Sequence, residues 1–167
     1  IIKVACLPGE RLQVYFIENE EYFKRKQFYF DDQDQPFDDN DERAIFFARG
    51  VIETVKKLNW VPDVIHINGW MSSFVPIYLK TYYKNDNYFA DTKIVLSLYN
   101  EKDGKIQNQI EDKMKFDNIE GLSAFKKPTF QSFVAESMNF VDAVVKGDEF
   151  LEGLLDKEFT KTQTTKM

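Results

Sequence analysis

Cysteine and histidine are almost missing from this 167-residue chain, which has one of each, Cys6 and His66. A single cysteine excludes a disulfide within the chain and is typical of a reducing compartment, so we expect a cytoplasmic protein. One cysteine and one histidine are also too few for a zinc site built from the usual ligands. The sequence therefore predicts no bound metal.

Long apolar runs and an excess of basic residues are missing too. No apolar run approaches the roughly 20 residues that a membrane-spanning helix needs. The net charge is −6, from 22 Lys and Arg against 28 Asp and Glu, which argues against binding to a nucleic-acid backbone. We therefore expect neither a membrane nor a nucleic acid as a partner.

The common glycine-dependent motifs are also absent from the sequence. There is no Gly-x-Gly-x-x-Gly after a strand-like run, no Gly-x-x-x-x-Gly-Lys-Ser/Thr phosphate loop and no Gly-x-Ser-x-Gly turn. Paired carboxylates at residues 31–32 and 38–39 lie in a charged loop and identify no glycoside-hydrolase pair. What the chain does contain is typical of one globular domain: 43% hydrophobic, 30% charged and 16% aromatic residues, the last predicting a core rich in rings.

The most informative stretch is residues 62–80, PDVIHINGWMSSFVPIYLK. Residues 63–67 predict a buried strand behind a proline, and Asn68-Gly69 supplies a turn. From Trp70 the apolar residues recur at helical spacing, with Pro76 early in the helix, where a missing amide donor costs least. In parallel sheets, ligands bind at the carboxyl ends of strands, and this turn lies at such an end.

Each side chain near this turn has a structural and a functional interpretation. His66 either forms a hydrogen bond within the sheet or lines a cleft. Trp70 either stacks on a sugar ring or begins the core of the helix. The amides near Trp70 and Met71 would be free at a helix N-terminus, which suits an anion or polar hydroxyls.

Regular structure is also predicted on both sides of this stretch. Residues 1–7 and 12–17 predict two strands that either pair as a hairpin or place the first at a sheet edge. A helical turn at 20–23 and a long loop at 24–37 precede the clearest helix, 39–59, with Asp39 and Glu42 as a capping box. Further elements are a strand at 93–99, short helices and loops at 101–127, a helix beginning at Thr129 or Ser132, a strand at 142–146 and a helix starting within 148–155.

This order predicts an α/β fold, a Rossmann-like, mainly parallel sheet with helices on both faces. Residues 1–155 would form an incomplete N-terminal domain, and residues 156–167 a flexible tail.

The stretch PDVIHINGW followed by VPIYLK resembles the strand-turn-helix segment of the bacterial glycogen synthase and plant starch synthase family. The family form is roughly Pro-Asp-hydrophobic-hydrophobic-His-x-His-Asp-Trp-His, then Pro-x-Tyr-Leu. Matches to this form are His66, Trp70, Pro76, Tyr78 and Leu79; departures are Asn68, Gly69 and Met71. The His-x-Asn-Gly-Trp version is similar to a variant branch of the family.

Two further segments extend the resemblance. Tyr99-Asn100 stands where the family has His-Asn at the end of the next strand, and Asp39-Asn40-x-x-Arg43 resembles the family's Asp-Asn-x-x-Arg. Each of these residues also has a structural alternative. Asn100 would stabilise a turn after the strand, and Asp39 would cap the helix. Arg43 would be a solvated charge rather than a contact to phosphate or glucan. The substrate-binding residues that the resemblance implies are His66, Asn68, Trp70, Met71, Tyr99, Asn100, Asp39 and Arg43.

The resemblance implies a retaining glycosyltransferase of the GT-B type, which has two Rossmann-like domains. Such enzymes transfer glucose from ADP-glucose or UDP-glucose to the non-reducing end of an α-1,4-glucan, without a metal and with no cofactor beyond the donor. The family's Lys-x-Gly-Gly-Leu loop and its C-terminal nucleotide-sugar-binding domain are not found here, so we predict that this chain alone is inactive. The alternative, favoured by Met71 and Tyr99, is a non-catalytic module that binds glucan or a partner protein.

Overall fold

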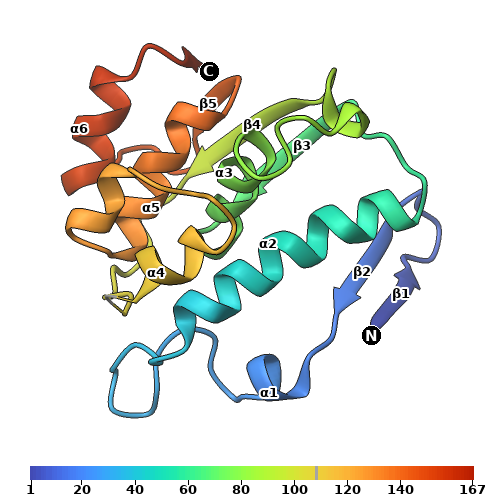
Figure 1. Ribbon diagram of the computed structural model, residues 1–167, viewed down its shortest axis with the longest axis horizontal. Helices are drawn as coiled ribbons and strands as arrows, with labels where there is room; N and C mark the ends of the chain where they lie inside the picture. The colour runs from blue at the N-terminus through green and yellow to red at the C-terminus, as the bar shows by residue number, and fades with distance from the viewer. Residues whose placement is uncertain (108) are drawn as a thin grey trace.

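The computed structural model describes residues 1–107 and 109–167 of the chain. Figure 1 shows a hairpin at the N-terminus and a sheet with helices packed on it, with the long helix α2 between them. The strands are β1 (Ile2–Cys6), β2 (Gln13–Ile17), β3 (Val64–Asn68), β4 (Lys93–Leu98), β5 (Ala143–Lys146) and β6 (Thr165–Lys166). The helices are α1 (Glu20–Phe23), α2 (Asn40–Lys57), α3 (Phe74–Lys80), α4 (Ile110–Lys115), α5 (Phe130–Ser137) and α6 (Gly153–Lys161), with short 3₁₀ turns at Met71–Ser73, Asn87–Phe89, Ser123–Lys126 and Met138–Phe140.

The strands β3 to β6 form one sheet in chain order, and all neighbouring pairs are parallel. The register places His66 beside Val95, and Val95 beside Ala143. The strands predicted at 63–67, 93–99 and 142–146 are therefore confirmed to within a residue or so at each end. The burial predicted for the first strand is wrong, because only Ile67 of β3 is buried. The predicted α/β fold with a mainly parallel sheet is confirmed as well.

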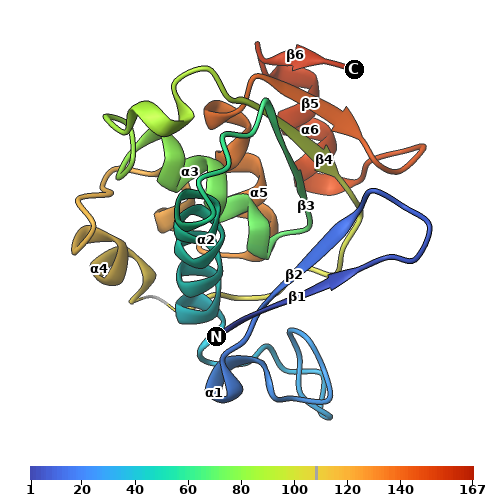
Figure 2. The same ribbon diagram turned by 90° about the vertical axis from the view of Figure 1, so that its right-hand side faces the viewer.

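Helices pack on one face of this sheet, and the other face is more exposed. Ile67, Leu96 and Val144 are buried on one face, and Figure 2 shows α2, α3 and α5 together on one side of the strands. The other face carries His66 and Val64, and Val64 is 55% exposed. The described residues thus differ from the expectation of helices on both faces. Because the strands advance in one direction across the sheet, right-handed crossovers place α3 and α5 on the same side.

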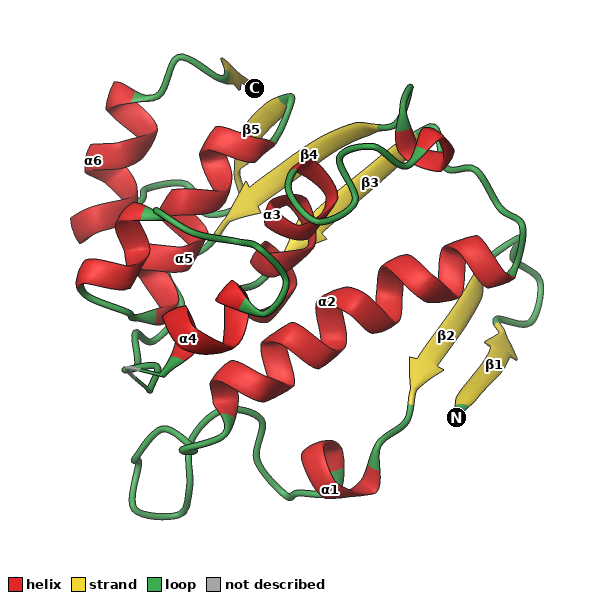
Figure 3. Ribbon diagram, viewed as in Figure 1, coloured by secondary structure: helices red, strands yellow, loops and turns green. Residues whose placement is uncertain are grey.

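The N-terminal strands form a separate antiparallel hairpin, one of the two expected arrangements. Figure 1 shows β2 alongside α2. The two elements approach closely at Gly50, where a Cβ atom would lie 3.2 Å from the Ile17 side chain. The loop predicted at 24–37 follows α1 and leads into α2 (Figure 3).

The capping box predicted at the start of α2 is wrong. Asp39 occupies the N-cap position, but its side chain accepts no capping hydrogen bond and instead pairs with Arg25 from the 24–37 loop. Glu42 accepts a 2.8 Å hydrogen bond from Lys113 of α4. Two ion pairs formed with distant parts of the chain thus replace the local cap.

The start of α5 shows the local pattern instead. Thr129 Oγ1 accepts from the Ser132 amide at 3.2 Å, and Ser132 Oγ accepts from the Thr129 amide at 2.9 Å. The helix places Phe130 and Phe133 in the core, where Phe130 stacks on Trp70 with ring centroids 3.9 Å apart and Phe133 stacks on Phe74 at 4.5 Å. The expected ring-rich core is confirmed.

The C-terminal residues depart from the sequence-based prediction. Residues 148–152 are not helical, and α6 begins only at Gly153. Asn100 explains the delay, because its side chain donates to the Phe150 carbonyl and accepts from the Glu152 amide, which fixes this segment as a loop. Residues 156–167, expected as a flexible tail, contain most of α6 and the strand β6.

Two negative findings concern the described residues. No helix there is both long and apolar enough to cross a membrane. Nor does any group of three or more His, Cys, Asp or Glu side chains in residues 1–107 and 109–167 come together in a way that could hold a metal ion.

Candidate functional site

The carboxyl ends of β3 and β4 lie side by side, as the sequence predicts. The parallel register pairs Asn68, the last residue of β3, with Ser97 of β4. Beyond this pair, the Tyr99 hydroxyl donates to Asn68 Oδ1 at 3.2 Å. The sheet therefore brings two of the implied substrate-binding residues into contact at the edge where parallel sheets hold ligands.

His66 lies on the exposed face of the sheet, two residues before Asn68, the last residue of β3. Its Nε2 atom is 2.8 Å from Ser97 Oγ, within hydrogen-bonding distance, so the imidazole links β3 to β4. This contact is the structural role considered for His66. A contact to substrate stays a prediction.

The turn after β3 is closed by an acidic residue that the sequence reasoning missed. Gly69 has a φ of +82°, the left-handed region that favours glycine. The next amide, that of Trp70, donates to Glu101 Oε2 at 3.1 Å. An anion was expected at the Trp70 and Met71 amides, and at Trp70 the carboxylate of Glu101 takes that position. The available signal was the position of Glu101, directly after Asn100 at the end of β4.

Trp70 belongs to the core and not to a sugar-stacking surface. Its side chain is 0% exposed, it stacks on Phe130, and the Tyr29 ring meets it edge-on at 5.1 Å. Within the described part of the chain, the indole Nε1 has no hydrogen-bond partner. The implied role of Trp70 in stacking on a sugar is therefore not what the structure shows, because no ring face is free.

Asn100 and Tyr99 hold the loop that follows β5. Besides its two side-chain bonds, Asn100 donates its backbone amide to Asp148 Oδ2 at 2.6 Å. The Tyr99 ring lies so close to Gly147 that a Cβ atom there would overlap it. These contacts explain both residues structurally, and their contact with substrate remains a prediction.

Arg43 and Met71 line one cavity of about 240 Å³ together with Asn68. The cavity lies at the carboxyl end of β3, and its walls come from β2, α1, the 24–37 loop, α2 and the turn after β3. Three of the eight implied substrate-binding residues therefore share one hollow. Its other polar lining residues are Tyr29 and Ser72, and its other apolar ones are Ile17, Phe23, Phe28 and Phe47.

Arg43 is not the solvated charge considered as an alternative, because it is only 2% exposed. Its Nη1 atom donates to Asn40 Oδ1 at 2.6 Å, and the guanidinium lies over the rings of Phe23 and Phe37. Its Nε atom has no hydrogen-bond partner in residues 1–107 and 109–167. Burial lowers the pKa of Arg43, and the neighbouring Arg25 lowers it further. Asp39, whose carboxylate binds Arg25, lies outside the set of residues that line the cavity.

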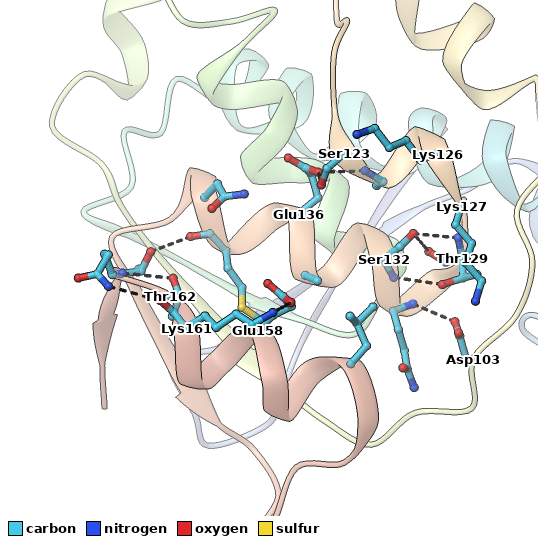
Figure 4. A pocket seen from close by; sticks show the side chains of 18 residues that line it. Asp103, Ser123, Lys126, Lys127, Thr129, Ser132, Glu136, Glu158, Lys161 and Thr162 are labelled. Atoms are coloured by element: carbon cyan, nitrogen blue, oxygen red, sulfur yellow. Dashed lines mark hydrogen bonds and ion pairs between the residues drawn. The ribbon is translucent and has the colours of Figure 1, made fainter.

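A larger groove of about 850 Å³ runs between α5 and α6 (Figure 4). Lys126, Lys127 and Thr129 lie at one end and Lys161 and Thr162 at the other. None of the implied substrate-binding residues lines this groove. The cavity at the end of β3 is therefore the better match to the sequence-based prediction.

The sequence of this chain is similar to those of known proteins. Residues 1–148 match the family model of the starch synthase catalytic domain. The glycogen synthase of Chlorobium limicola is 41% identical over 100 residues, which cover 59% of this chain and 20% of that protein. The glycogen synthase of Chlorobium luteolum is 36% identical over 122 residues, 72% of this chain and 25% of that protein. The chain thus spans about a fifth to a quarter of the length of these relatives.

A solved structure shows the same fold. The catalytic domain of starch synthase IV from Arabidopsis thaliana, bound to ADP and acarbose, matches with a TM-score of 0.61 at 22% sequence identity. The match covers 86% of this chain and 29% of that one. At this identity the likeness concerns the fold alone, and the family follows from the sequence match over residues 1–148. The chain therefore belongs to the starch synthase catalytic domain family.

Proposed function

We propose that this chain is the acceptor-side part of an enzyme that transfers glucose from ADP-glucose or UDP-glucose to the non-reducing end of an α-1,4-glucan, with retention of configuration. The family match over residues 1–148 is the observation that carries this proposal. The glycogen synthases that resemble the chain support it. ADP bound to the Arabidopsis neighbour makes ADP-glucose the first donor to test.

The arrangement at the carboxyl end of β3 is consistent with this role. Asn68, Met71 and Arg43 line one cavity there, so polar and apolar groups face a common space. Tyr99 joins them through its bond to Asn68. In this proposal His66, Asn100 and Asp39 act on the substrate from the same edge, the donor is a substrate rather than a cofactor, and the enzyme works in the cytoplasm.

The chain by itself is proposed to be inactive. It spans about a fifth to a quarter of the length of its relatives. The resemblance to GT-B enzymes implies that most contacts to the nucleotide sugar come from a second domain. The test measures transfer of labelled glucose from each donor to a maltooligosaccharide. We expect no turnover by the 167-residue chain, and turnover when it is joined to both a family Lys-x-Gly-Gly-Leu segment and a family C-terminal domain. Turnover by the chain alone would contradict the inactivity.

The second candidate function is a non-catalytic module that binds glucan or a partner protein. Met71 favours it, because a thioether cannot make the hydrogen bond that a histidine would make at this position. Tyr99 favours it too, because its hydroxyl is already used by Asn68. Glucan binding without turnover by the longer protein would support this alternative over the enzyme.

A further inference from the structure

Arg43 is a buried cation without a carboxylate partner among the described residues. No ion pair within 4.0 Å involves it there, and its Nε atom is unpaired. Asp39, whose charge acts on Arg43, binds Arg25 through both carboxylate oxygens. A buried charge is costly unless it is paired, and an unpaired guanidinium donor in a native structure calls for an explanation.

The cavity beside Arg43 supplies a place for the missing partner. It holds about 240 Å³, less than the 300–1,000 Å³ or so that drug-sized ligands occupy. Arg43, Asn68, Ser72 and Tyr29 contribute polar groups to its lining. The remaining lining side chains, which include Phe23, are apolar. The hollow is therefore small, and it presents both one cation and an apolar wall.

We propose that this cavity binds a small oxyanion joined to a compact apolar body, with the Arg43 guanidinium as the anion-binding group. The planar fork of an arginine matches the oxygens of a phosphate or a carboxylate. The phenylalanine rings of the wall would then cover the apolar body. The proposal rests on the proposed function, because the same cavity holds the Arg43, Asn68 and Met71 side chains assigned to substrate there.

The first test measures equilibrium binding to the 167-residue chain by calorimetry. The probes are phenyl phosphate, which has both parts, inorganic phosphate, which lacks the ring, and phenol, which lacks the anion. We expect phenyl phosphate to bind at least about tenfold more tightly than either of the others, because each part contributes its own contacts. Equal affinity for the two phosphates would overturn the apolar part of the proposal, and no binding of either would overturn all of it.

The second test changes Arg43 itself. Arg43→Met keeps much of the side-chain volume and removes the charge, so phenyl phosphate should bind at least about tenfold more weakly. Arg11→Met, at an exposed position in the turn between β1 and β2, changes the net charge equally and should bind as the wild type does. Unchanged affinity in a folded Arg43→Met variant would overturn the proposal.

A third variant keeps the test decisive if Arg43→Met fails to fold. Ser72→Met adds volume to the cavity while Arg43 stays in place. Phenyl phosphate binding should weaken by a similar factor, and unchanged binding would show that the ligand occupies another surface. Because all three readouts are binding equilibria, their failure is distinct from a failure of glucosyl transfer in the longer protein.

Discussion

Two arginines on α2 have opposite surroundings. Arg49 Nη1 lies 3.0 and 3.2 Å from the two oxygens of Asp117, and the buried Tyr78 hydroxyl donates to the same carboxylate at 2.8 Å. Burial lowers the pKa of Arg49, but Asp117 and the nearby tyrosines outweigh it and hold the pKa above its ordinary value. Burial lowers the pKa of Arg43, and there the opposing charges do not prevail.

Arg49 therefore contributes to the packing of the fold through its ion pair with Asp117, whereas Arg43 is buried without an ion pair among the described residues. Tyr78 lies in α3 and Arg49 lies in α2, so the carboxylate of Asp117 ties these two helices to the segment that follows α4. Arg43 lies in the same helix, but among the residues that the structure describes its side chain contacts Asn40, on the first turn of that helix, and two aromatic rings, with no carboxylate. Removing the two arginines should therefore have different consequences for stability.

The largest effect is expected at the centre of the paired network. Asp117→Leu would leave the buried Tyr78 hydroxyl and Arg49 without their acceptor, and we expect it to lower the free energy of unfolding by about 3 kcal/mol. Urea denaturation measures this. Asp117→Asn keeps an oxygen for Tyr78, so its loss should be smaller, about 1–2 kcal/mol. Equal stability of Asp117→Leu and the wild type would show that the network adds nothing.

A direct comparison of the two arginines should show a smaller effect. Arg49→Met is expected to cost about 1 kcal/mol, a modest value because the Arg49 side chain is 43% exposed. Arg43→Met removes an uncompensated buried charge, so its stability should lie between no change and a gain of about 1 kcal/mol. Parallel urea titrations of both variants make the comparison. A loss at Arg43 as large as that at Arg49 would mean that Arg43 is satisfied by groups of the fold.

The fold could be predicted from sequence wherever a signal is local. The β-branched run at residues 63–67 and the apolar stripe of 39–59 gave β3 and α2 correctly, because period and turn chemistry determine both. The predicted helix starts were wrong where contacts with residues distant in sequence determine the local structure. Asp39 and Glu42 have the pattern of a capping box, yet Arg25 and Lys113 bind them. The delayed start of α6 depends on Asn100, about fifty residues earlier in the chain.

The candidate site was predictable in its position but not in its contacts. Parallel pairing alone places Asn68 and Tyr99 at one edge. Burial of Trp70 depends on Tyr29 and Phe130, which are remote in sequence and carry no pattern that points to it. The role of Glu101 at the Trp70 amide depends on the exact path of the chain after β4, which a linear sequence does not reveal.

The smallest predicted effect concerns Glu42, which lies beside Arg43 in sequence but binds Lys113. The hydrogen bond from Lys113 lowers the pKa of Glu42 below its ordinary value. A carboxylate with a lowered folded-state pKa adds stability above its unfolded pKa, about 4.3, and loses it as the pH falls through the folded pKa. The stability advantage of the wild type over Glu42→Gln should therefore shrink as the pH falls below about 4.3.

Urea titrations at several pH values would measure this difference, with Glu10→Gln in the exposed hairpin turn as the matched control. Glu10 is exposed and takes part in no ion pair within the described residues, so Glu10→Gln removes the same charge without breaking such a contact. If the difference between Glu42→Gln and the wild type did not change with pH, Lys113 would not hold this carboxylate, and Glu42 would be free to serve as the partner that Arg43 lacks. The same titration therefore tests whether Arg43 is unpaired because the acids around α2 are already engaged elsewhere.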